Sequence, residues 1–111
     1  MDVRVEIQTN GVAVIALDGR LDLLSAVTVK ERLGKEVLAG NMRLVVDLGA
    51  VTFIDSSGLG ALIGGLKAAR QAGGDLRIAR PTNQALVVLK LTSLDRVLRP
   101  FASVEEAVAG Y

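Results

Sequence analysis

An acid, two serines and a glycine follow one another at Asp55-Ser56-Ser57-Gly58, directly before a segment with helical periodicity. The backbone N–H groups at a helix start have no partner within the helix, and they favour negative charge. A phosphate esterified to a serine at this place would be stabilised in the same way as a free phosphate at a helix start. The simpler interpretation is that Asp55, Ser56 and Ser57 only cap the helix, as these residue types commonly do.

Four glycines fall in the first half of the same predicted helix: Gly58, Gly60, Gly64 and Gly65. A glycine inside a helix costs about 0.5–1 kcal/mol relative to alanine. We expect close internal packing at Gly64 and Gly65, whereas Gly58 and Gly60 flank the serine pair and could keep it accessible. The apolar positions of this helix are predicted to face the core: Leu59, Leu62, Ile63 and Leu66.

Histidine and cysteine are both absent from the 111 residues. Their absence excludes Cys/His zinc sites, cysteine nucleophiles, Ser-His-Asp triads and imidazole acid–base chemistry. The formal net charge of +1, from 13 basic and 12 acidic residues, gives no reason to expect direct nucleic-acid binding. The longest apolar runs, 12–17 and 85–89, are far shorter than the about 20 residues of a membrane span. We therefore expect a cytoplasmic protein without catalytic residues or a bound cofactor.

Other motif interpretations fail on spacing. The pattern Gly58-x-Gly60-x-x-x-Gly64 has one residue too many for a dinucleotide fingerprint. It also follows an expected seven-residue loop, 49–55, where the fingerprint needs a tight turn after a strand. There is no Walker A sequence, and neither serine has the flanking glycines of a nucleophile elbow. Asp22, Asp47 and Asp55 could in principle gather around Mg²⁺, but we favour no metal site.

The elements that must position the serines follow from hydrophobic periodicity. One domain over 1–111 is expected from the length. Asn10-Gly11 predicts a hairpin between the first two strands. We predict strands over residues 3–7, 12–17, 43–48, 75–80 and 96–100. We predict helices from a Ser25 cap to about 39, over 57–72, over 85–91 after Thr82 or Asn83, and from a Ser103 cap to about 109. The order ββαβαβαβα indicates an α/β fold with a mixed sheet and about four helices.

Two sets of side chains have more than one interpretation. Leu23-Leu24 is more apolar than expected after a strand; core burial is favoured over a partner contact. Asp22 itself could be a plain turn residue. The basic residues of the C-terminal half are interpreted as solvated surface: Arg77, Arg80, Lys90, Arg96 and Arg99.

The stretch Phe53-Ile54-Asp55-Ser56-Ser57-Gly58-Leu59-Gly60 resembles the STAS domain family, specifically its single-domain anti-sigma factor antagonists. Gly19-Arg20-Leu21-Asp22, Leu44-Val45-Val46-Asp47-Leu48 and Gly73-Gly74 are also typical of that family. The element order and length match, so the resemblance covers essentially the whole chain.

This resemblance implies a mechanism. An unphosphorylated antagonist binds an anti-sigma factor that is also a serine kinase, and the sigma factor is released. The kinase uses ATP to phosphorylate the first serine of the motif, here Ser56, and a PP2C-type serine phosphatase restores the antagonist. Partner contacts are expected around Asp22, Asp55, Ser57, Gly58, Leu59 and Gly60. ATP and Mg²⁺ belong to the partners, and nothing requires more than a monomer.

A phosphate on Ser56 would add about −1.5 to −2 charges beside Asp55, and beside Asp22 if the two loops lie close. Two like unit charges about 6 Å apart repel by roughly 3 kcal/mol at an effective dielectric near 20, about a hundredfold in affinity. Two other functions remain open. The first is a non-switching STAS accessory or scaffold subunit of a transport or stress-signalling complex. The second is a small phosphoryl- or nucleotide-handling enzyme, which the missing histidine and P-loop disfavour.

Overall fold

The structure, a computed structural model, describes all 111 residues and contains one mixed five-stranded sheet. The strands lie in the order β1-β2-β3-β4-β5, with β1 antiparallel to β2 and all other neighbours parallel. The strands are β1 (Asp2–Ile7), β2 (Ala13–Leu21), β3 (Arg43–Ile54), β4 (Asp75–Ala79) and β5 (Pro100–Phe101). The helices are α1 (Leu23–Leu38), α2 (Ser56–Gln71), α3 (Asn83–Leu91), a 3₁₀ turn η1 (Leu94–Arg96) and α4 (Val104–Ala109). The predicted α/β fold class is confirmed.

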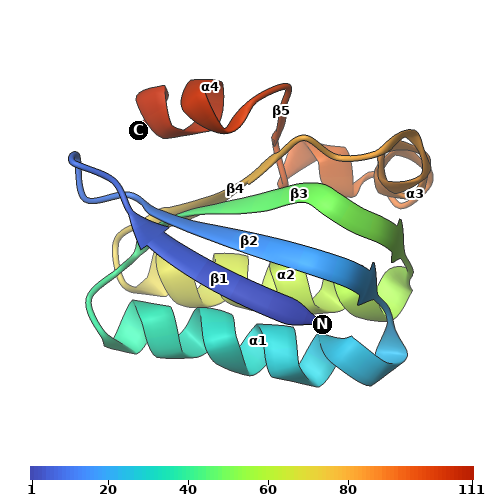
Figure 1. Ribbon diagram of the computed structural model, residues 1–111, viewed down its shortest axis with the longest axis horizontal. Coiled ribbons are helices and arrows are strands. Elements are labelled where there is room, and N and C mark those ends of the chain that lie inside the picture. The colour runs from blue at the N-terminus through green and yellow to red at the C-terminus, as the bar shows by residue number, and fades with distance from the viewer.

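Helices α1 and α2 cover one face of the sheet, and α4 lies on the opposite face (Figure 1). The strands alternate accordingly: Ile15 and Val46 belong to the large core with α1 and α2, whereas Val14 and Val45 belong to a small core under α4. This alternation follows from the two-residue period of a strand. Because both faces are covered at the centre of the sheet, β3 is apolar in both directions there.

The strand β3 is longer than predicted, and this difference matters for the site. The sequence suggested an end at Leu48 and a loop over 49–55, but the strand continues to Ile54. Its pairing with β2 shifts at Asp47/Ala50 and again at Val51/Phe53, so β3 bulges twice along β2. A bulge inserts an unpaired residue without ending a strand. The predicted loop is wrong, and the serine motif therefore follows a strand directly.

Several boundaries also differ. Helix α1 begins at Leu23 with Asp22 as N-cap, rather than at Ser25. The last strand is displaced to Pro100–Phe101, because Leu94–Arg96 forms the 3₁₀ turn. The hairpin is confirmed, although five residues connect its strands and only Gly11 has a positive φ, of 84°. Thr82 and Ser103 cap α3 and α4 as expected.

Candidate functional site

The serine motif lies where the parallel strands β2 and β3 end and the helices α1 and α2 begin. Leu21 and Ile54, the last residues of the two strands, are register partners. Because parallel neighbours end at the same edge of a sheet, the two following loops meet. The Asp55 N–H donates to the Leu21 carbonyl at 3.3 Å, which joins the loops through the backbone. The expected proximity of the Gly19–Asp22 segment to Asp55 is confirmed.

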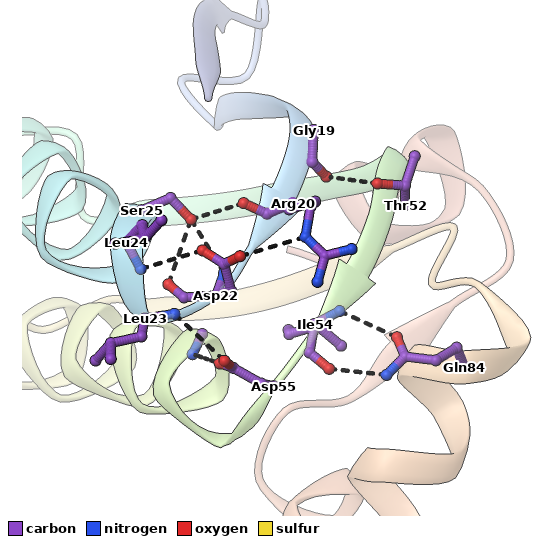
Figure 2. Close-up of polar contacts among 11 residues, drawn as sticks. Gly19, Arg20, Asp22, Leu23, Leu24, Ser25, Thr52, Ile54, Asp55 and Gln84 are labelled. Carbon is purple, nitrogen blue, oxygen red and sulfur yellow. Dashed lines mark hydrogen bonds and ion pairs between the residues drawn. The ribbon is translucent and has the colours of Figure 1, made fainter.

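A single carboxylate, that of Asp55, serves both helix starts (Figure 2). Its Oδ1 accepts from the Gly58 N–H at 2.9 Å and so caps α2. Its Oδ2 accepts from the Leu23 N–H, in the first turn of α1, at 3.3 Å. The prediction of a cap here was right in kind, but Asp55 makes it and Ser57 does not. Asp55 therefore couples the geometry of the α2 start to that of α1.

A second carboxylate, that of the N-cap residue Asp22, also accepts from the first turn of α1. Its Oδ1 accepts from the Leu24 N–H at 3.1 Å, while the Asp22 N–H donates to Ser25 Oγ at 3.0 Å. The Arg20 side chain donates to Asp22 Oδ2 at 3.3 Å, and its guanidinium lies 4.4 Å from the Phe53 ring centroid. Asp22 is thus a helix cap in a capping box, which answers whether it is only a turn residue.

The two serines occupy the first two positions of α2. Ser56 is exposed and Ser57 is half-buried. Neither hydroxyl makes a hydrogen bond within the chain, since the cap of α2 comes from Asp55. The Ser56 hydroxyl is therefore exposed and without a hydrogen bond, and it lies at the positive end of the helix dipole of α2, beside the start of α1.

The glycines after the serines differ from one another in their surroundings. Gly58 is buried, and a Cβ there would collide with the backbone carbonyl oxygen of Leu21. The expectation that Gly58 keeps the serines accessible is wrong, because its role is the close approach of α2 to the end of β2. Gly60 is exposed, and a Cβ there would meet nothing within 4 Å. Leu59 is 1% exposed, so it supports the loop from the core side.

Farther along α2, the expected internal packing of Gly64 and Gly65 is confirmed. A Cβ on Gly64 would lie 3.0 Å from Lys30, and one on Gly65 would lie 2.5 Å from Leu33. Both neighbours belong to α1, so these two glycines allow the helices to pack closely. Gly60, which has no such neighbour, is the glycine of this helix that internal packing does not explain.

An exposed apolar patch adjoins the site at the start of α1. Leu23, Leu24 and Val27 are 71%, 90% and 65% exposed. Core burial of the two leucines, favoured from the sequence, is wrong. The buried face of α1 is formed by Ala26, Val29 and Leu33 instead. Apolar side chains gathered at one place on a surface are typical of an interaction site.

The third carboxylate of the sequence analysis lies elsewhere. Asp47 is on the α4 side of β3, where Arg80 donates to both of its oxygens at 2.9 and 2.7 Å. Burial alone would raise the pKa of Asp47, but the hydrogen bonds and charge of Arg80, with the Gly49 N–H, lower it below the usual value. The same contact raises the pKa of Arg80. Asp22, Asp47 and Asp55 do not converge, and no group of three acidic side chains forms a metal site.

Two of the arginines interpreted as solvated surface also make contacts within the chain: Arg80 is exposed as expected, whereas Arg77 is half-buried. Arg80 pairs with Asp47, and Arg77 lies over the rings of Tyr111 and Phe101 at 4.1 and 5.3 Å. The Tyr111 hydroxyl donates to the Leu44 carbonyl at 2.6 Å. Burial, followed by the nearby charge of Asp75, raises the pKa of Tyr111 to about 12.

One residue near the motif was not found from the sequence. The Gln84 side chain of α3 exchanges two hydrogen bonds with the backbone of Ile54, accepting from its N–H at 3.0 Å and donating to its carbonyl at 2.8 Å (Figure 2). It substitutes for a neighbouring strand, because β4 pairs only as far as Asp47 on β3. Gln84 and Ile54 are 30 residues apart in the sequence, so nothing local in the sequence indicates that they are in contact.

The family model of the STAS domain matches residues 4–107. The chain belongs to the STAS domain family. RsfB, an anti-sigma-F factor antagonist of Mycobacterium tuberculosis, is 33% identical over 101 residues, which cover 91% of this chain and 82% of RsfB. The anti-sigma-B factor antagonist of Bacillus subtilis is 26% identical, and the match covers 97% of this chain and 99% of that relative.

A solved STAS structure supports the same assignment. The Thermotoga maritima protein TM1081, described as a candidate anti-sigma factor antagonist, superposes with a TM-score of 0.86 at 26% identity, over 97% of this chain and 92% of its own. In this STAS domain the serine motif lies at the junction of β3 and α2. No helix of the domain has the length and apolar character needed to cross a membrane.

Proposed function

We propose that this STAS domain is an anti-sigma factor antagonist controlled by phosphorylation of Ser56. In the unphosphorylated state it binds an anti-sigma factor that is also a serine kinase, and the sigma factor is released. The observation that carries the proposal is the Ser56 hydroxyl, which is exposed and unbonded at the first position of α2. The names of its relatives, antagonists of anti-sigma-F and anti-sigma-B factors, support the same role.

The reaction at Ser56 is a phosphoryl transfer from ATP held by the kinase. The Ser56 Oγ forms a bond to the γ-phosphorus, the bond from that phosphorus to the bridging oxygen breaks, and ADP leaves. The hydroxyl proton passes to a base of the kinase, so this domain supplies only the acceptor. Hydrolysis of the phosphoserine by a PP2C-type phosphatase returns the hydroxyl.

The new charge acts on the partner more than on the fold. The phosphate adds about −1.5 to −2 charges next to Asp55. Both oxygens of Asp55 already accept backbone N–H groups, and two helix starts face this place, so the charge is partly compensated within the free domain. A partner surface shaped for a neutral hydroxyl has no such compensation. We expect the phosphorylated domain to keep its fold and to lose affinity.

The contact surface in this proposal combines Ser56 with two features around it. Gly60 follows Ser56 by one helical turn on the exposed side of α2, where a partner's backbone can approach closely. The apolar patch of Leu23, Leu24 and Val27 provides the hydrophobic part, and Asp55 links it to the α2 start through the Leu23 N–H. Full burial of one leucine contributes about 1.5–3 kcal/mol, so this patch could supply much of the affinity.

The test is phosphorylation by a candidate anti-sigma serine kinase from the same genome, with ATP, followed by mass spectrometry. Phosphate on Ser56 that Ser56→Ala abolishes and Ser57→Ala retains supports the proposal. Binding to the kinase is then measured by calorimetry before and after modification. Equal affinity in the two states refutes the switch, even where Ser56 is modified.

The second candidate function, a non-switching scaffold subunit, predicts a different result. A scaffold binds its partner regardless of the state of Ser56, and it needs no phosphoacceptor. One copy of the chain is sufficient for the switch, and its partners act on transcription, so we place it in the cytoplasm.

A further inference from the structure

The first strand of the sheet has an open side. β1 is at one end of the strand order, it pairs only with β2, and Figure 1 shows no element beyond it. In an antiparallel pair, residues alternately direct their backbone N–H and C=O toward the neighbour and away from it. The Gln8 N–H donates to the Val12 carbonyl at 2.8 Å, in register with the rest of the ladder. The even-numbered residues of β1 therefore face β2, and Val3, Val5 and Ile7 direct their backbone groups outward.

The side chains of β1 are also divided between the two faces. Val3 and Val5 pack against the large core, and Ile7 is 52% exposed at the end of the strand. Arg4 and Glu6 are exposed on the opposite face. Neither takes part in a salt bridge within the chain, since the four ion pairs involve other residues. Glu6 accepts only a hydrogen bond from the Gln8 side chain, at 3.4 Å. The outer edge thus carries unpaired backbone groups, and one cation and one anion without a salt-bridge partner.

We propose that a second copy of this chain pairs with β1 in antiparallel orientation, joining two sheets into one of ten strands. The register places Val5 opposite Val5 and Val3 opposite Ile7. The outward backbone groups then form hydrogen bonds in three residue pairs, one Val5–Val5 pair and two Val3–Ile7 pairs. In this register Arg4 of each copy faces Glu6 of the other, on the face away from the large core. Cross-strand pairs of opposite charge stabilise a sheet, and like pairs destabilise it.

The neighbouring registers do not satisfy these requirements. A shift that brings Val3 opposite Val5 also sets Arg4 against Arg4 and Asp2 against Glu6, which are three like-charge contacts. A shift in the other direction sets Glu6 against Glu6. A shift by one residue directs the inward-facing groups of the even residues at the partner, and no ladder forms. Charge and backbone geometry therefore select the same register over the length of β1.

The dimer leaves the serine site available. β2 lies between β1 and β3, and Ser56 follows β3, so the pairing strand itself does not cover it. A single pair of strand edges forms a small interface of the kind found in weak complexes, so we expect reversible association that depends on concentration. The expected monomer is therefore replaced by a dimer only at high protein concentration. This inference is independent of the function proposed above.

Sedimentation velocity over a range of concentrations tests association. Wild-type protein should show a concentration-dependent dimer. Arg4→Glu and Glu6→Arg should each weaken it by about tenfold or more, and the double variant should restore it because the pairs are reversed. Lys67→Glu, the same charge change on exposed α2, is the matched control and should leave the dimer intact. A wild-type protein that stays monomeric at millimolar concentration overturns the proposal.

Cross-linking tests the register, because the chain has no cysteine of its own. In the proposed dimer, position 4 of one copy faces position 6 of the other. A mixture of Arg4→Cys and Glu6→Cys proteins under mild oxidation should therefore form mainly the mixed disulfide, with little of either homodimer. Random pairing, or a majority of Arg4→Cys homodimer, contradicts the register. Circular dichroism of each variant shows whether its fold is retained.

Discussion

Two glycines of the serine motif, Gly58 and Gly60, should respond to alanine in opposite directions. At Gly58 the new Cβ would collide with the carbonyl oxygen of Leu21, a backbone atom that cannot move aside, and would lie 2.8 Å from the Leu21 Cγ. Overpacking of this kind costs about 1–3 kcal/mol. At Gly60 nothing lies within 4 Å, and replacing glycine in a helix gains about 0.5–1 kcal/mol.

Urea and thermal unfolding measure both effects. At about 4 °C per kcal/mol for a domain of this size, Gly58→Ala should lower the melting temperature by roughly 4 °C or more. Gly60→Ala should raise it by roughly 2–4 °C. Gly34→Ala in α1 is a matched control, because its Cβ would also meet nothing within 4 Å. Wild-type stability of Gly58→Ala would refute the close packing of α2 against the end of β2.

The affinity for the anti-sigma kinase should distinguish the Gly60→Ala variant from the Gly34→Ala variant. If Gly60 admits the partner's backbone beside Ser56, Gly60→Ala should bind more weakly although it is more stable. Gly34→Ala should gain stability without losing affinity, because its methyl group lies farther along α1. Equal affinity of both variants and the wild type would show that Gly60 is not needed for the approach of a partner.

Three further outcomes are expected. Leu24→Ser should weaken kinase binding by about tenfold or more, whereas Leu38→Ser, at an equally exposed position of the same helix, should have no effect; similar losses would point to general hydrophobicity. Asp47→Asn should cost about 1–2 kcal/mol at pH 7 in urea unfolding. Because folding lowers the pKa of Asp47, its stabilisation is present above the ordinary value near 4 and is lost as the pH falls, so the difference between Asn variant and wild type should shrink in acid. Folding raises the pKa of Tyr111 to about 12, so its contribution is present below pH 10 and lost as the pH rises toward 12; Tyr111→Phe should unfold with a weaker dependence on alkaline pH, and an unchanged dependence would contradict burial of the hydroxyl.

The order of helices and strands was predictable, because each element has its own periodicity and punctuation. Thr82 and Ser103 were recognised as caps for this reason, as was the hairpin at Asn10-Gly11. The end of β3 was not, since its last part is a bulged strand whose pairing depends on β2, more than 30 residues away. Gly49 interrupts the apolar run and was interpreted as its end, although Val51, Phe53 and Ile54 are residue types that are common in strands.

The sequence by itself determined that an acid and two serines stand at a helix start, and that histidine and cysteine chemistry is absent. Only the tertiary structure decided which structural role each residue of the motif and its surroundings has. Asp55 caps both helices, Gly58 packs against Leu21, and Leu23 and Leu24 remain exposed. The physical reason is that residue type and spacing specify local hydrogen bonding, whereas exposure and close approach depend on what distant segments bring alongside. The Ser56 hydroxyl has no hydrogen bond because Asp55, which lies where the neighbouring strands β2 and β3 end, already caps α2.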